Sequence, residues 1–548
     1  MSNFISQVGA LQTPGAQQQK ISPNIEAMSD DRKWLVLLAV SLITAVEVSN
    51  RLSINVLLPD MQGNVAATSD QISWVLTLYN VGFICSMVLS AGTRLILGAR
   101  RHFLSCVALY SLGAIGCFLS GHSLSLLLAS RVMMGFGGGA FLVRLVVVSF
   151  AFFPGALGRK PMTYALSILF GAQIVYPTAM GMINDALHWN YAFLIDFPFI
   201  AMGTYVVWKY MPPGHIYVIE QNKRFDFRGS ALLILSMFAL QFALSRGEQD
   251  RWFDSTWIAS AFGVGIVSFV FFLIWELNPG NDQPVLHLRR ILETRSLRAS
   301  FALVLVLGAI MGTSLFILPQ YLRNVQNFSA TQTGEFFGLY ASGVCVGGLL
   351  CLRVLLPRWG GLPTTLFGFS LMAIILVASI EIWTPDTPTY LLALICLMQG
   401  FSIGPLWFGV ANLAVGQIDL PHVSEGEATY FFVRQFGNSL GVTAAAVLFD
   451  RRMTFHSARL LDSANRLNPI VPQFLGAYAG TIAKNGGGGS NPTAGALQIF
   501  QGLVVVQARL LTFVDISFCL GILCVIGAVL ALVCRGEIKK ALHFLHVW

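Results

Sequence analysis

Apolar runs of about 20 residues recur along almost the whole chain, and most of them are separated by short polar turns. A helix of this length crosses the ~30 Å hydrocarbon core of a lipid bilayer. Only 11% of the residues are charged, whereas about 25% are charged in an average soluble domain. Because lipid offers no hydrogen bonds to the backbone, each run must satisfy its own polar groups as a helix. The sequence therefore predicts an all-α polytopic membrane protein.

We expect about 14 transmembrane helices from the hydropathy pattern. A polar tail, residues 1–33, precedes the first apolar run, which is too long for the core of a signal peptide and is therefore kept as a span. The predicted spans begin near residues 34, 73, 103, 124, 162, 190, 230, 257, 299, 334, 361, 388, 427 and 511.

The basic residues of the short loops divide into two sets that alternate along the chain. The richer set contains Arg100, Arg101, Arg159, Lys160, Lys223, Arg224, Arg228, Arg289, Arg290, Arg295, Arg298, Arg353 and Arg358. The poorer set contains Arg246, Arg251 and Arg323. Because cytoplasmic loops carry an excess of Lys and Arg, the richer set and both termini are predicted to be cytoplasmic. We expect a multi-pass plasma-membrane protein, in the inner membrane if the source has two membranes.

Several other classes of function lack support in the sequence. The net charge is +8, but no basic patch with interleaved aromatic residues predicts nucleic-acid binding. The nine cysteines lie in or at the ends of apolar runs without the spacing of metal ligands, so no metal or other cofactor is expected. Neither a phosphate-binding GxxxxGK[ST] loop nor a nucleophile elbow is present, which argues against ATP coupling and against an enzyme.

One predicted outward loop is long, from residue 450 to residue 509, and it contains the glycine run Gly486–Gly489. Its composition predicts flexibility. Two interpretations are open, a solvated spacer and a docking surface for an extracytoplasmic partner. The end of the chain, residues 536–548, is predicted to be a basic amphipathic cytoplasmic tail on the inner leaflet.

Ionisable residues inside apolar spans are candidates for function, because a charge in hydrocarbon costs from about 2.5 kcal/mol upward. Glu47, Arg51, Arg131 and Arg144 are the clearest cases. Glu47 and Arg51 share one helix face, and Glu47 and Arg131 are predicted at similar depth in the outer half of the membrane. A movable arginine beside Glu47 forms a proton switch, and a static ion pair is the alternative. Arg144 either reaches toward the cytoplasm or meets an anionic substrate.

Several motifs lie along nearly the whole chain after the tail. One, in the fourth span, consists of Leu127, Arg131, Met134, Gly135 and Gly137–Gly139. The others are Asn55–Pro59, Trp74–Tyr79, Trp189–Pro198, Phe225–Gly229, Arg434–Gly441, and Gln507 and Ala508 with Asp515. Together they resemble the motifs of 14-span drug:proton antiporters of the EmrB/QacA type, within the major facilitator superfamily, and the motif of the fourth span is similar to that of antiporters.

This resemblance implies two six-helix bundles around a central cavity, with two extra helices inserted between them. The expected units are an N-terminal bundle, 34–211, the linkers and extra helices, 212–298, and a C-terminal bundle, 299–535. Alternating access would rock one bundle against the other around a site at the membrane midplane. Asn50 stands at the family's acidic position in the first span, and Leu95 stands in the loop before the third span where an aspartate is common.

Three groups of residues are predicted to serve transport. The candidates for proton coupling are Glu47, Arg51, Arg131 and Asp196. The candidates for the substrate cavity are Asn50, Arg144, Gln399 and Asn412, although the two amides of the twelfth span also suit bonding between helices. The candidates for gating and helix packing are Gly98, Arg100, Arg101, Gly135, Gly139, Pro177, Gly181, Arg434 and Gly437.

The predicted function is proton-driven export of amphipathic small molecules, either drugs or a secreted metabolite such as a siderophore. A transporter-like receptor or scaffold that moves no substrate is the alternative from another class. In a bacterium with two membranes, the resemblance also implies a periplasmic adaptor and an outer-membrane channel as partners.

Overall fold

The computed structural model describes residues 22–67, 69–153, 159–216, 226–247, 250–278, 280–281, 284–286, 288–418, 423–463, 470–484, 492–533 and 535. Within these ranges the secondary structure is helical, without a strand. The glycine run Gly486–Gly489 and the predicted C-terminal tail, 536–548, lie outside the described residues, as does the tail up to residue 21.

The first bundle is built from helices that pack around one continuous hydrophobic core, formed by residues between Ile25 and Ile216. Its elements are α2 (Pro23–Glu26), α3 (Asp30–Asn64), α4 (Ser69–Leu97), α5 (Ala99–Leu119), α6 (Leu124–Gly138), α7 (Phe141–Phe152), α8 (Arg159–Ala186), the 3₁₀ helix η2 (Trp189–Ile195) and α9 (Asp196–Tyr210).

The second bundle has its own core, formed mainly by residues between Leu297 and Ala531. Its elements are α12 (Leu288–Glu293), α13 (Arg295–Asn324), α14 (Ala330–Leu350), the π-helical turn η4 (Cys351–Leu355), α15 (Leu356–Trp359), α16 (Gly361–Ile382), α17 (Thr389–Val415), α18 (Val423–Ser463), α19 (Ile470–Lys484) and α20 (Pro492–Val533). Leu52, Val56 and Phe170 of the first bundle join this core, so the two bundles touch along α3 and α8.

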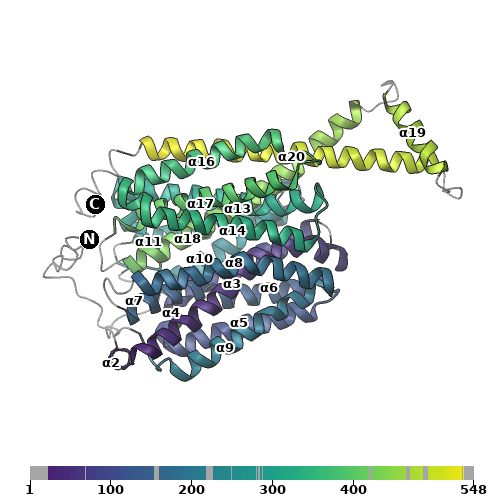
Figure 1. Cartoon of the computed structure of the whole chain (residues 1–548). Helices are drawn as coiled ribbons and strands as arrows, with labels where there is room; N and C mark the ends of the chain where they lie inside the picture. The colour runs from purple at the N-terminus through teal and green to yellow at the C-terminus, as the bar shows by residue number, and fades with distance from the viewer. Residues whose placement is uncertain are drawn as a thin grey trace.

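Two further helices, α10 (Phe227–Arg246) and α11 (Thr256–Leu277), follow the first bundle, and the short 3₁₀ helix η3 (Trp252–Asp254) lies between them. A third apolar cluster joins Met237 of α10 and Phe272 of α11 to Ile84 of α4 and Phe432 of α18. The extra helices therefore contact both bundles (Figure 1). This arrangement confirms the predicted all-α fold of two bundles with two inserted helices.

Among the described residues, twelve helices are long and apolar enough to cross a membrane. The predicted spans near residues 73 and 427 correspond to α4 and α18, which pack against α6 and α13 inside the bundles. The fourth predicted span is divided into α6 and α7, because the helix is interrupted at Gly139 and Ala140.

The chain between residues 450 and 509 departs from the prediction. In its described part, α18 and α20 continue beyond the bundle and join α19 in a projecting helical arm (Figure 1). At 42 residues, α20 is about 63 Å long, roughly twice the thickness of the hydrocarbon core. The prediction of a flexible segment is wrong for these helices.

Tertiary contacts explain why the arm is ordered. Phe474 stacks on Tyr478 at 4.3 Å between ring centroids, and Phe474 also meets Phe500 of α20 at 5.5 Å. At the base of the arm, Asp515 of α20 lies 2.7 Å from Nε2 of His456 and 3.4 Å from Nε of Arg452, both on α18. Helices that are marginal alone are stabilised by packing of this kind.

Candidate functional site

Glu47 is fully buried in the middle of α3. Its Oε1 accepts a hydrogen bond of 2.6 Å from the Tyr79 hydroxyl of α4 and lies 3.4 Å from Nε of Arg51, one turn further along α3. Its Oε2 has no hydrogen-bond partner among the described residues. A buried carboxyl with one free oxygen has room to carry a proton there without breaking its other contacts.

Asp196, at the first position of α9, is buried with both oxygens occupied. The Tyr110 hydroxyl and the Asn50 amide each donate to Oδ2 at 3.0 Å, and the Tyr176 hydroxyl donates to Oδ1. Three donors from α3, α5 and α8 therefore converge on this one carboxyl group.

Arg131 of α6 lies between these two carboxyl groups without forming an ion pair with either. Its guanidinium stacks over the Tyr79 ring at 4.3 Å and donates to Oδ1 of Asn50 at 3.5 Å and to the carbonyl of Val75 at 3.3 Å. Tyr79 thus stands between Arg131 and Glu47, where direct contact was expected. Glu47, Asn50, Arg51, Tyr79, Tyr110, Arg131, Tyr176 and Asp196 together form one group, which we call the buried polar network.

Arg51 connects the buried polar network to the second bundle. Its Nη1 donates to Oε1 of Gln435 on α18 at 3.2 Å, and the Gln435 amide donates to Oδ1 of Asn80 on α4 at 3.2 Å. The guanidinium also lies over the Phe83 ring at 4.5 Å. The same arginine therefore contacts Glu47 on one side and the opposite bundle on the other.

The glycines of the fourth span make room for this network. A Cβ added at Gly138 would lie 2.8 Å from Cγ of Glu47 and 2.9 Å from the Tyr79 hydroxyl. At Gly135 and Gly139 an added Cβ would collide with the α4 backbone, at Tyr79 and Phe83 respectively. These two candidates therefore act as packing residues that let α6 approach α4 closely.

Three cavity candidates lie apart from the buried polar network. Arg144 of α7 is buried, and its Nη2 lies 3.0 Å from Nδ1 of His102 on α5, inside the first bundle. On α17, Gln399 is buried, and Asn412 faces Gly361 at the start of α16. Of the four predicted cavity residues, the structure brings only Asn50 to the proton-coupling candidates.

Two gate candidates at the start of α5, Gly98 and Arg100, contact the segment that follows α9. Gly98 has φ +76°, which favours glycine, and an added Cβ there would lie 2.9 Å from the carbonyl oxygen of Gly214. The backbone N–H of Ala99 donates to that carbonyl at 2.7 Å, and Nη1 of Arg100 donates to the Met211 carbonyl at 3.4 Å. Arg101 is exposed on the outer surface of α5.

The remaining candidates lie where helices touch closely. Gly181 faces Ala330, and the Pro177 carbonyl faces Gly334, so both belong to the contact of α8 with α14 between the bundles. Gly437 packs on Leu305 of α13 within the second bundle. Arg434 is buried, with its guanidinium 4.6 Å from the centroid of Trp407.

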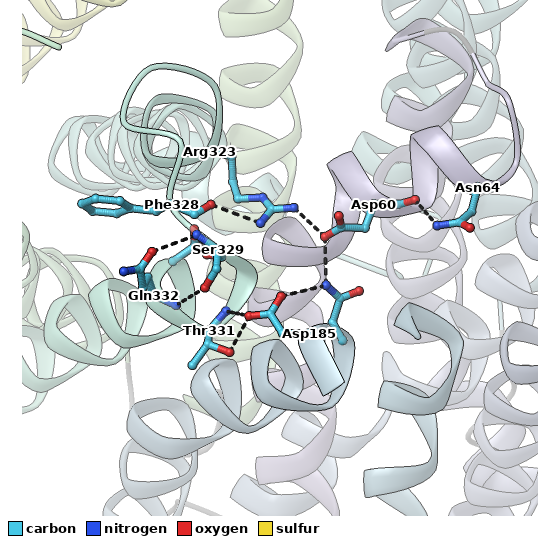
Figure 2. A network of polar contacts seen from close by, with 10 residues as sticks. Asp60, Asn64, Asp185, Arg323, Phe328, Ser329, Thr331 and Gln332 are labelled. Atoms are coloured by element: carbon cyan, nitrogen blue, oxygen red, sulfur yellow. Dashed lines mark hydrogen bonds and ion pairs between the residues drawn. The ribbon is translucent and has the colours of Figure 1, made fainter. Parts of the chain in front are cut away.

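A second polar cluster joins the two bundles at the ends of α3, α8, α13 and α14 that the loop charges predict to face outward (Figure 2). Asp60 accepts from Nη2 of Arg323 at 2.6 Å and from the Asn184 amide at 3.0 Å. Asp185 accepts from the Thr331 hydroxyl at 2.6 Å and from its backbone N–H at 2.9 Å. We call these residues, Asp60, Asn184, Asp185, Arg323 and Thr331, the outer clasp.

The sequence pattern did not predict the tyrosine partners or the outer clasp. Tyr79, Tyr110 and Tyr176 each lie inside an apolar span, where a buried hydroxyl needs a partner, and that requirement was the available signal. Asp60 and Arg323 carry opposite charges near the outer ends of their spans, but 263 positions separate them and no pattern predicted their contact.

Similarity to known proteins extends over most of the chain. The family model described as Major Facilitator Superfamily matches residues 40–442. The chain is 25% identical over 453 residues to the multidrug export protein EmrB of Haemophilus influenzae, which covers 80% of this chain and 85% of that protein. EmrB of Escherichia coli is also 25% identical, over 79% of this chain and 84% of its own length. The probable multidrug resistance protein EmrY of Escherichia coli is 24% identical, over 82% of this chain and 87% of its own length.

Solved structures with the same fold share little sequence with this chain. A POT family transporter in complex with a thioalcohol-conjugated peptide aligns with a TM-score of 0.63 at 11% identity, over 94% of this chain and 99% of the other. A bacterial homologue of the human lysosomal transporter Spinster, in an inward-facing and unoccupied conformation, aligns with a TM-score of 0.58 at 14% identity. The alignment covers 94% of this chain and 99% of the other. These likenesses support the fold.

Proposed function

The chain belongs to the major facilitator superfamily, and from that premise we propose that it exports amphipathic small molecules in exchange for protons by alternating access. The names of the relatives support export of drug-like compounds, since EmrB is a multidrug export protein and EmrY a probable multidrug resistance protein. A dedicated metabolite such as a siderophore is the alternative cargo. Either cargo is expected to pass between the two bundles, where Arg51 meets Gln435.

The contact chain from Glu47 through Arg51 to Gln435 carries this proposal. When Glu47 is ionised, its carboxylate attracts Arg51 at 3.4 Å and competes with Gln435 for the guanidinium. A proton on Glu47 removes that attraction and frees Arg51 to bond elsewhere. Proton binding in the first bundle thereby alters a contact with the second bundle, which is the coupling that antiport requires.

Glu47 and Asp196 take different parts in the proposed cycle. Glu47 has the free oxygen Oε2, so it is the proton carrier. Asp196 accepts three hydrogen bonds and holds α3, α5 and α8 against α9 as a fixed acceptor. Arg131 is buried and contacts the network through Tyr79 and Asn50.

Transport by purified protein in proteoliposomes tests the proposal. With an imposed pH gradient and membrane potential, vesicles that contain the protein should move an uncharged fluorescent amphipathic compound against its gradient, and an uncoupler should stop the movement. A proton that crosses ~100 mV supplies about 2.3 kcal/mol, so one coupled proton supports a concentration ratio of about fiftyfold. Movement that ignores the uncoupler would contradict proton coupling. No movement of any drug or siderophore tried would favour a non-transporting scaffold.

We further propose that the helical arm docks an extracytoplasmic partner, such as a periplasmic adaptor. The arm extends beyond the bundle and displays exposed apolar side chains, among them Leu461 of α18, Tyr478 of α19 and Leu497 of α20. Exposed apolar side chains beyond the membrane are typical of a surface that another protein covers.

Glutamate substitutions at Leu461 and Leu497 should separate partner binding from transport. The double variant should lose drug resistance in cells that contain the partner, while its transport in proteoliposomes stays unchanged. Thr481→Glu, at an exposed polar position of α19, is the matched control and should affect neither. Full resistance with the double variant would contradict a docking role for the arm.

A further inference from the structure

A groove of about 540 Å³ runs along the outside of the first bundle between α5 and α9. Its walls are apolar for most of their length, with Leu104, Val107 and Ala108 on one side and Ile200 and Ala201 on the other. This volume falls within the ~300–1,000 Å³ of typical ligand sites. Because the groove lies between two membrane-spanning helices, its apolar walls face lipid chains.

Two cations lie on the same helix faces as the groove. Arg101 precedes Leu104 and Ala108 by three and seven residues on α5, and Lys209 follows Tyr205 and Ala201 by four and eight residues on α9. Both basic side chains are exposed. They belong to the ends of α5 and α9 that the loop charges predict to be cytoplasmic, so both stand at one end of the groove.

Apart from Asp196, which is buried at the opposite end of α9, the two helices contain no acidic residue. Residues 99–119 and 197–210 contain neither Asp nor Glu. Lys209 contacts aromatic side chains: its Nζ donates to the Tyr205 hydroxyl at 3.3 Å and lies 5.5 Å from the ring centroid of Tyr205 and 5.3 Å from that of Tyr210. An apolar trough that ends in uncompensated positive charge is complementary to a molecule with an anionic head and an apolar tail.

A polar group within the groove adds a third feature of the same kind. The Thr204 hydroxyl lines the groove and is buried without a hydrogen-bond partner among the described residues. Thr204 lies five residues from Lys209, about 8 Å along the helix. In a phospholipid, the ester carbonyl of the acyl chain lies just below the phosphate. It would accept the hydrogen bond for which the Thr204 hydroxyl has no partner among the described residues. Trp208 and Tyr205, both exposed at this end, suit the interfacial zone of a bilayer.

We propose that the groove between α5 and α9 binds an anionic phospholipid of the cytoplasmic leaflet, with its phosphate between Arg101 and Lys209 and an acyl chain along the groove. A neutral phospholipid would fill the apolar part equally well but would gain little from the two cations. The site is therefore selective for head-group charge. It is separate from the buried polar network, and its test does not depend on transport.

Quenching of Trp208 fluorescence provides a local measurement of the lipid in the groove. The full-length protein is reconstituted in phosphatidylcholine vesicles that contain a minor fraction of phosphatidylglycerol, with bromine on the acyl chains of one lipid at a time. The difference from Trp208→Phe isolates the signal of this tryptophan. Each cation near an anionic lipid is expected to contribute about fivefold to the enrichment, so the two cations together give about twenty- to thirtyfold.

The double variant Arg101→Gln/Lys209→Gln should abolish this enrichment. Arg295→Gln/Arg298→Gln removes two exposed cations from the start of α13 on the same side of the membrane, and this control should keep it. Ala108→Phe/Ala201→Phe fills the groove from two exposed positions and should lower the quenching by both lipids. Equal quenching by both brominated lipids in the wild type would overturn the proposal. An equal loss in the Arg295/Arg298 control would overturn it as well, because general surface charge would then explain the enrichment.

Discussion

Glu47→Gln should leave a folded protein that no longer exports substrate in response to a pH gradient. The amide keeps an oxygen to accept from Tyr79 and has nearly the size of the carboxyl, so the buried site is not emptied. It does not titrate, and its attraction for Arg51 is permanently reduced. Loss of one coupled proton at ~100 mV lowers the maximal accumulation ratio about fiftyfold. Proton-driven uptake into inverted proteoliposomes measures this change.

Two matched variants test whether Glu47, and not another buried carboxyl, carries the proton. Glu276 is buried in α11 and accepts from the Leu286 backbone, far from the buried polar network, so Glu276→Gln should transport normally. Asp196→Asn should lower stability in thermal unfolding, because one of the two oxygens that accept from Tyr110, Asn50 and Tyr176 becomes a donor. Gradient-driven transport by Glu47→Gln at the wild-type level would remove Glu47 as the proton carrier.

A covalent bridge across the outer clasp should stop transport completely. The Asp185 carboxylate and the Thr331 hydroxyl are 2.6 Å apart and belong to opposite bundles (Figure 2). Alternating access requires the outer ends of α8 and α14 to separate in each cycle. Cysteines at both positions, joined by a short bifunctional thiol reagent, should hold them together, and a reductant that cleaves the reagent should restore activity. The starting protein for this experiment has its native cysteines replaced.

A bridge inside one bundle provides the control. Nδ1 of His122 lies 3.1 Å from the carbonyl oxygen of Asn64, and both residues are at the outer end of the first bundle. Asn64→Cys/His122→Cys, bridged by the same reagent, should transport at the rate of the unbridged protein because the bundle moves as a unit. If the Asp185–Thr331 bridge also leaves transport intact, the outer ends do not separate, and the rocking of one bundle against the other is excluded.

The ionisable residues of the candidate site were recognisable in the sequence because charge is expensive in hydrocarbon. Glu47, Arg51 and Arg131 stood out in apolar spans, and the structure places all three in one buried network. Asp196 entered through a motif, and it too joins the network. Their partners were not recognisable. A buried tyrosine hydroxyl needs a partner, but that requirement did not indicate that Tyr79, Tyr110 and Tyr176 would each donate to a carboxyl group.

For the segment from 450 to 509, the structure differs from the sequence-based prediction. Glycine content and low hydropathy between two spans favoured a flexible loop, yet α18, α19 and α20 extend through its described part. These helices are stabilised by the ring contacts of Phe474 with Tyr478 and Phe500 and by the contacts of Asp515 with His456 and Arg452. Local composition does not report contacts between residues that are 26 to 63 positions apart.

The sequence by itself determined that the protein is embedded in lipid and that its fold class is all-α. Both follow from the length of the apolar runs and the distribution of charge, which depend only on the order of the residues. It also determined which charged groups had to be buried. Only the tertiary structure decided their pairing: that Tyr79 separates Glu47 from Arg131, that Arg51 reaches Gln435, and that Asp60 meets Arg323. These contacts join separate helices, and their geometry depends on how close the backbones approach, which the packing of Gly135, Gly138 and Gly139 sets in three dimensions.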